Sequence, residues 1–154
     1  MASASQVERA AMLGLAASVQ PTFDAVWGGS GGLYEQGLGE ARAAAMNPFR
    51  EMLDRGMELG AGSDTPVTPL DALLGVAALE HHHDPAQRLD RVEGIRVHTI
   101  GGARLAHQED KKGSLHPGAH ADLTAWDDDP FTAPDLTSLH PILTVSLGRE
   151  VFAA

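Results

Sequence analysis

The spacing of apolar residues in the first half of the chain predicts alternating helices and strands. Val7, Ala10 and Ala11 lie at helical spacing, with Gly14 as the expected end of that helix. Two short apolar runs, residues 15–19 and 57–61, are bounded by turn residues and are typical of buried strands. The pattern is therefore that of an α/β fold in which helix and strand alternate.

Two further helices are indicated by residues that favour helix starts. Asn47 and Pro48 fit the N-cap and first position of one helix, and Thr68 and Pro69 fit the same positions of the next. The second of these helices carries leucines on one face and is expected to run to about His81.

Residues 91–106 are predicted to form another helix, which begins with a capping box. Asp90 is the expected N-cap, and Glu93 stands three residues later, where its side chain can bind back to the cap. Glycine lowers helix stability by about 1 kcal/mol relative to alanine, so the helix is expected to break near Gly101.

Residues 22–39 are rich in glycine and follow neither the helical nor the strand period. We therefore expect a long loop, serving as the wall or lid of a substrate site or as a plain linker. The segment Gly28–Gly32 lacks the lysine of a phosphate-binding loop, and no capped helix follows it directly.

The pattern changes at the charged turn formed by residues 108–113. Beyond it lie short runs with strand character, at residues 121–126, 142–147 and 150–152. The sequence thus predicts two segments: residues 1–107 with alternating helices and strands, and residues 108–154 with strands of a small β domain.

Composition narrows the range of functions. The 154 residues include 21 acidic and 11 basic side chains, and the formal charge of −10 disfavours nucleic acid as a partner. No apolar run approaches the roughly 18 residues of a membrane span, and the amino-terminal sequence does not resemble a signal peptide, so a cytoplasmic protein is expected. Without cysteine, a metal site must use His, Asp or Glu.

Asp64 is the strongest candidate for chemistry. It follows the apolar run at residues 57–61 in a turn that leads to a helix. In parallel barrels, catalytic residues stand in such connections, where a carboxylate can bind a divalent metal and accept a proton from a metal-bound water. Aspartate is also common in turns, so the spacing alone leaves open a role that only braces Thr65 and Pro66.

The histidines are expected to be structural. In His81–His83, adjacent side chains on a helix would point about 100° apart, so at most two could share a metal, and the helix dipole favours them at a C-terminus. The other histidines are expected to be packing, turn or surface residues: His98, His107, His116, His120 and His140.

Three segments have a recognisable pattern: LGAGSDTPVTPLD at residues 59–71, the long segment at residues 98–131 and LTVSLGREVF at residues 143–152. Together they resemble the C-terminal portion of the third amidohydrolase family, a branch of the metal-dependent amidohydrolase superfamily. LAASVQPTF and MNPFREMLDRGMELGAGSD also resemble late barrel strands of that family, so the similarity covers nearly the whole chain.

The resemblance implies a (β/α)₈ barrel with a small β-sandwich made from both chain ends. It further implies hydrolysis of C–N bonds in small-molecule amides or cyclic amides, using a divalent metal, with zinc the first expectation. In that family the aspartate of the G-S-D step after the eighth strand is a metal ligand or proton acceptor, and this position falls on Asp64. The glycine-rich hairpin at residues 113–118 would be structural.

The departures from the family pattern concern the metal ligands. The family's H-x-H pair, its mid-barrel lysine or acidic bridge and its further histidines have no counterpart here, and Phe23 stands near a position that is histidine in many relatives. The chain is thus expected to be an incomplete barrel that starts after the sixth strand, and to bind zinc weakly through Asp64 alone. The alternatives are an inactive or split chain that needs an N-terminal half or a homo-oligomer and, third, a small acidic interaction module.

Overall fold

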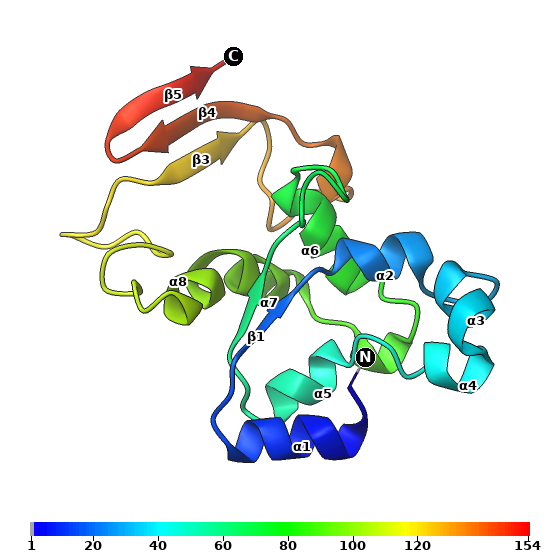
Figure 1. Cartoon of the computed structure of the whole chain (residues 1–154). Coiled ribbons are helices and arrows are strands. Elements are labelled where there is room, and N and C mark those ends of the chain that lie inside the picture. Colours follow the sequence, from blue (N-terminus) through cyan, green and yellow to red (C-terminus); the bar gives the residue numbers. More distant parts are fainter. Residues whose placement is uncertain (1) are drawn as a thin grey trace.

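The computed structural model describes residues 2–154. Figure 1 shows a helical part that surrounds two short parallel strands, and a separate three-stranded antiparallel sheet formed by the end of the chain. The chain is therefore a mixed α/β structure. No helix among the described residues is long and apolar enough to cross a membrane.

The first helix and strand agree with the sequence prediction. Helix α1 (Ala4–Met12) starts at Ser3, whose side chain and that of Gln6 form a capping box. Gly14 then adopts the left-handed conformation (φ 65°), which lets the chain turn into β1 (Ala17–Val19).

The prediction of a long loop over residues 22–39 was wrong. Helix α2 (Thr22–Trp27) and helix α3 (Leu33–Leu38) occupy most of it, and the glycine-rich residues 28–32 only connect them. Pro21 is suited to a helix start, and Trp27 packs on Phe23 with ring centroids 4.5 Å apart. These local contacts outweigh the low helix propensity of the neighbouring glycines.

Two short helices precede the second strand, and here the predicted cap was also wrong. Helix α4 (Glu40–Ala43) is followed by α5 (Phe49–Asp54), whose N-cap is Pro48 rather than Asn47. Asn47 adopts a left-handed backbone (φ 56°), and its side chain bonds to a distant residue instead of to the helix. Strand β2 (Leu59–Ala61) follows.

Strands β1 and β2 pair in parallel, with Ala17 opposite Leu59 and Val19 opposite Ala61. Parallel pairing means that both strands end at the same edge of the sheet. The connection after β1 leads into α2, and the connection after β2 contains Asp64.

Helix α6 (Ala72–Glu80) starts later than the sequence indicated. Its N-cap is Asp71, whose carboxylate accepts a hydrogen bond from the Leu74 amide at 3.0 Å. The predicted cap, Thr68, instead donates its hydroxyl hydrogen bond to the Ser63 carbonyl and braces the preceding turn. A short 3₁₀ helix, η1 (Pro85–Gln87), lies beyond α6.

The predicted long helix is present and irregular. It consists of α7 (Arg91–Arg96), the π-helical turn η2 (Val97–Gly101) and α8 (Gly102–Leu105), and the predicted Asp90–Glu93 capping box is confirmed. The irregularity falls at the expected glycine. A Cβ on Gly101 would lie 2.1 Å from the Leu59 carbonyl oxygen, so glycine allows the helix to approach β2 closely.

The predicted strands after residue 120 are confirmed. Strand β4 (Pro141–Ser146) lies between β3 (Leu123–Trp126) and β5 (Arg149–Ala153), and all pairings are antiparallel. The 3₁₀ helix η3 (Leu136–Ser138) precedes β4 and packs against α6.

Two buried clusters hold the structure together. The first joins the strand pair to the helices around it and consists of Val19, Phe49, Leu59, Leu79, Leu89 and Val97. The second joins α6 to the segment before β4 and consists of Leu73, Val76, Ala133, Leu136 and Leu139. Helix α6 contributes to both clusters and so connects the helical part to the C-terminal part.

Candidate functional site

Asp64 stands beyond the C-terminal end of β2, in the connection to α6. Its backbone adopts the left-handed conformation (φ 55°), in which aspartate is one of the better tolerated residues. Its carbonyl oxygen accepts a hydrogen bond from the Val67 amide at 2.8 Å and closes the turn. The residue is exposed at the sheet edge where β1 also ends.

The Asp64 carboxylate does not brace this turn. Among residues 2–154 its oxygens make no side-chain hydrogen bond and no ion pair. The turn is held by backbone groups and by the hydroxyl of Thr68, which is 4% exposed. An exposed carboxylate with free lone pairs can accept a proton or bind a cation.

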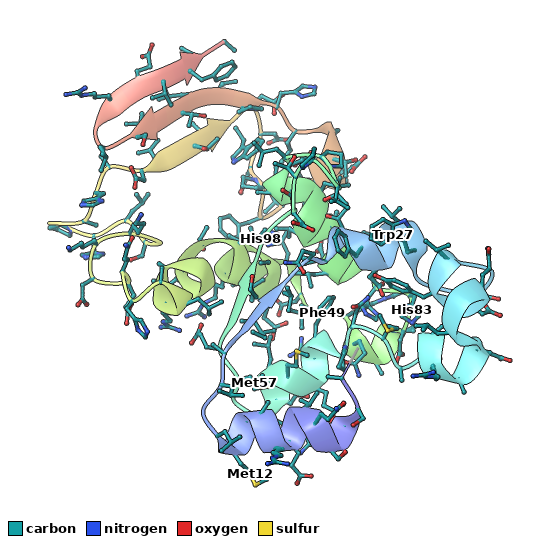
Figure 2. All side chains as sticks on the ribbon, viewed as in Figure 1. Met12, Trp27, Phe49, Met57, His83 and His98 are labelled. Carbon is teal, nitrogen blue, oxygen red and sulfur yellow. The ribbon has the colours of Figure 1, made fainter. Side chains whose placement is uncertain are left out.

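A second arrangement of functional side chains was not predicted. Asp24 of α2 meets His82 and His83, which follow the end of α6 (Figure 2 labels His83). The Nδ1 atom of His83 lies 2.7 Å from Asp24 Oδ1, and Nε2 of His82 lies 3.2 Å from the same oxygen. We call these three residues the Asp24 cluster.

The Asp24 carboxylate is almost completely buried and receives several hydrogen bonds. The His83 amide donates to Oδ2 at 3.0 Å, and the Asn47 side-chain amide donates to Oδ1 at 3.0 Å. Asp24 is 2% exposed, and within the described residues the basic side chains within 4 Å of its oxygens are the two histidines. Asn47 thus connects the segment before α5 to the Asp24 carboxylate.

His82 is fully buried and held from both ring nitrogens. Nδ1 accepts a hydrogen bond from the Asp84 amide at 3.0 Å, and Nε2 lies 3.0 Å from the Asn47 carbonyl oxygen. Its ring also stacks on His83, with centroids 4.5 Å apart. Burial lowers the pKa of His82, against the opposing effect of the Asp24 charge, and so favours the neutral imidazole.

The expectation for His81–His83 rested on a wrong premise. Helix α6 ends at Glu80, so His82 and His83 lie on an irregular segment where helical directions do not apply. His81 is exposed, and its Nδ1 bonds to the Ala77 carbonyl oxygen at 2.9 Å, as expected for a residue at a helix end. The sequence contained no local signal that pairs His82 or His83 with Asp24.

The remaining histidines are spread over the structure. His98 is partly buried over Gly75, where a Cβ would lie 2.4 Å from its Nε2, and burial lowers its pKa. His107, His116 and His140 are exposed. A groove of about 710 Å³ lies between α6, α7 and the three-stranded sheet, but neither Asp64 nor the Asp24 cluster lines it.

Comparison with known proteins identifies the family. A sequence profile described as the amidohydrolase family matches residues 1–152. This chain belongs to the amidohydrolase family. The resemblance noted in the sequence is thereby confirmed.

This amidohydrolase chain corresponds to part of its relatives. It is 29% identical to a Bacillus subtilis protein that bears the name amidohydrolase YtcJ, over 95% of the chain and 29% of the relative. It is 33% identical to an imidazolonepropionase of Micrococcus luteus, over 54% of the chain and 21% of the relative. The chain therefore spans less than a third of either relative.

Solved structures agree with the family. A metal-dependent hydrolase of Pyrococcus horikoshii superposes with a TM-score of 0.75 and 27% identity, over 88% of this amidohydrolase chain and 29% of that structure. The mixed α/β arrangement described above is thus that of a segment of an amidohydrolase fold.

Proposed function

We propose that the chain is the C-terminal part of a metal-dependent amidohydrolase, in which Asp64 serves as a metal ligand and proton acceptor. The observation that carries the proposal is the location of Asp64. Its free, exposed carboxylate follows directly after one of two parallel strands, at the edge where both strands end. Catalytic groups in parallel barrels occupy this edge.

The strand arrangement supports a barrel origin. Two parallel strands, each followed by helices, correspond to the last two β/α units of a (β/α)₈ barrel, with residues 1–107 as the barrel segment. Residues 108–154, which include the three-stranded sheet, are then the contribution of this chain to a small β-sandwich. The barrel is incomplete in this chain, and the missing units belong to an N-terminal part.

The number of ligands that a catalytic metal needs also supports a division of the site between this chain and an N-terminal part. A catalytic zinc site uses about three protein ligands, and this part of the structure offers one carboxylate at the strand edge. Asp64 fits as one ligand, and the others must come from the N-terminal part. When bound, a metal such as zinc lowers the pKa of its water and thereby supplies a nucleophile at neutral pH.

Within this arrangement Asp64 has two properties that suit a proton acceptor. Its oxygens are free of competing donors among the described residues, and its backbone is fixed by the Val67 hydrogen bond and the neighbouring Thr68 contact. The carboxylate can therefore take up a proton at an oxygen without breaking a structural hydrogen bond. The substrates proposed are small-molecule amides or cyclic amides, and the proposed location is the cytoplasm.

The test uses the complete protein, either as one chain or as this chain co-expressed with its N-terminal part. Asp64→Asn should lower turnover of an amide or cyclic amide substrate by at least about 10³-fold, because it removes both the proton acceptor and a charged ligand. Asp110→Asn is the matched control, since Asp110 is also exposed and lies in a surface turn. Near-normal turnover in Asp64→Asn would disprove the role.

The second candidate is a catalytically inactive chain that folds only with a partner. It is favoured by the two-stranded sheet, because parallel sheets are normally covered on both faces and extended by further strands. A complete complex that contains the other metal ligands and still lacks hydrolytic activity would support this candidate instead.

A further inference from the structure

We infer that Asp24, His82 and His83 form a binding site for a divalent transition metal, with zinc as the representative ion. The site shares no residue with the proposed role of Asp64. It would link the segment after β1 to the segment after α6, two regions far apart in the sequence. The proposal replaces the expectation, drawn from Asp64 alone, that the chain binds zinc weakly.

Asp24 is a buried carboxylate whose charge is only partly compensated. Asp24 is 2% exposed, and no lysine or arginine among the described residues pairs with it. Burying a carboxylate is costly unless a cation or several donors compensate for the lost water. Hydrogen bonds from Asn47 and His83 supply part of that compensation, and a divalent cation would supply the rest.

The distances between the three side chains are close to those of a zinc site. Ligand atoms about 2.0 to 2.1 Å from a tetrahedral zinc lie roughly 3.3 Å from one another. The observed distances to Asp24 Oδ1 are 3.2 Å from His82 Nε2 and 2.7 Å from His83 Nδ1. One ligand atom from each of the three residues lies within 4.8 Å of the other two. A small outward movement of the His83 ring would fit the ion.

The three side chains also offer the donor atoms that zinc prefers. Two imidazole nitrogens and one carboxylate oxygen are ligands for zinc and its neighbours in the first transition series. His82 can offer its Nε2 lone pair when the ring proton moves to Nδ1, where the Asp84 carbonyl oxygen lies 3.2 Å away as an acceptor. The hydrogen bond to the Asp84 carbonyl then replaces the one that Nδ1 accepts from the Asp84 amide. A carbonyl that orients the second ring nitrogen is a usual companion of a metal-binding histidine.

Two neighbouring groups complete the surroundings. The Asn47 carbonyl oxygen, 3.0 Å from His82 Nε2, is close enough to supply a fourth ligand. The second ring nitrogen of His83 is buried and has no hydrogen-bond partner among the described residues, so it can carry the ring proton while Nδ1 binds the ion. This shift gives up the 2.7 Å hydrogen bond from Nδ1 to Asp24 Oδ1, which a shared ion would replace. Both features make metal binding at the Asp24 cluster compatible with the surrounding structure.

The experiment is zinc titration of the chelator-stripped protein by calorimetry, with Co²⁺ absorption as a second probe. We expect one zinc per chain with sub-micromolar affinity. His83→Ala should weaken binding more than about 100-fold, because removal of a ligand costs more than removal of a supporting group. His81→Ala is the matched control and should bind like the unmodified protein, since His81 is exposed and outside the cluster.

Asp64→Asn separates this proposal from the proposed function. Sub-micromolar zinc binding should persist in this variant, whereas its loss would assign the ion to Asp64 and overturn the inference.

If His83→Ala does not fold, X-ray absorption of the zinc-loaded unmodified protein decides. Two imidazoles and an oxygen donor around the metal support the Asp24 cluster, and a zinc shell without two imidazoles contradicts it. Equal zinc affinity in the unmodified protein and folded His83→Ala would mean that the cluster is only a hydrogen-bond network.

Discussion

Arg50 and Glu93 form a two-point ion pair between α5 and α7. Nη1 of Arg50 lies 2.8 Å from Glu93 Oε1, and Nη2 donates to the other carboxylate oxygen. Glu93 also accepts a hydrogen bond from the Asp90 amide in the capping box. One carboxylate therefore supports both a helix start and a contact between helices.

Replacing this charge should make the protein less stable near neutral pH. Glu93→Gln keeps an acceptor for the capping box but loses the ion pair, and it should lower the free energy of unfolding by about 1 kcal/mol. Glu58→Gln is the control, because Glu58 pairs with Arg104 at a more exposed position and should cost close to nothing. Urea unfolding at pH 7 measures both, and equal losses would contradict the expectation.

The same pair predicts a pH dependence. The hydrogen bond from Arg50 lowers the pKa of Glu93 below its ordinary value of 4.5. A carboxylate with a lowered folded-state pKa contributes stability above about pH 4.5 and loses it as the pH falls through the folded-state pKa. The stability difference between the unmodified protein and Glu93→Gln should therefore shrink on acidification, and a constant difference from pH 7 to pH 3 would exclude this origin.

Replacing two adjacent glycines, Gly101 and Gly102, by alanine should change the stability of the protein in opposite directions. A Cβ on Gly101 would collide with the Leu59 carbonyl oxygen, so Gly101→Ala should cost about 3 kcal/mol or more, or prevent folding. Gly102 has a helical backbone and open space around its Cβ position, so Gly102→Ala should stabilise by up to about 1 kcal/mol. Thermal unfolding of the two variants measures the difference. A melting temperature of Gly101→Ala equal to that of the unmodified protein would contradict the prediction.

Burial of His98 predicts a loss of stability at mildly acidic pH. Burial lowers its pKa below the ordinary value of 6.5, so its contribution is present above about pH 6.5 and is lost as the pH falls through the folded-state pKa. His98→Asn should reduce the slope of stability against pH between pH 6.5 and 5. Denaturation at pH 8, where His98 is neutral in both states, gives the baseline, and an unchanged slope would rule out His98 as the source.

The chain alone should self-associate. Strands β1 and β2 form a sheet of two, so each presents an unpaired edge among the described residues. Unpaired edges are sites of strand addition and aggregation. Light scattering at tens of micromolar should detect oligomers or larger particles, whereas a stable compact monomer would argue against an incomplete barrel.

Local chemistry decided which parts of this fold could be predicted. The Asp90–Glu93 box was predictable because its two residues stand three positions apart, and β1 and β2 were predictable from short apolar runs. The segment at residues 22–39 was not, because its glycines hid the contact of Phe23 with Trp27. Phe23 and Trp27 stand only four residues apart, so this contact is local, but the surrounding glycines masked its helical spacing.

The two candidate sites differ in how far apart their residues lie in the sequence. Asp64 could be selected because its position after an apolar run is a local feature, although its role stays a prediction. Asp24 meets His83 across 59 positions, and Asn47 reaches the same carboxylate from a third segment. Only the folded chain brings these residues together, so no spacing in the sequence could have indicated the cluster.

The pairing of β1 with β2 also sets an order of events during synthesis. Leu59 emerges roughly 40 residues after its partner Ala17, which at typical translation speeds is a delay of about 2 to 8 s. During that time β1 lacks its partner β2, while α2 and α3 can already form from local contacts. Nascent chains of this protein should therefore be most vulnerable to chaperone capture or proteolysis before residue 61 leaves the ribosome.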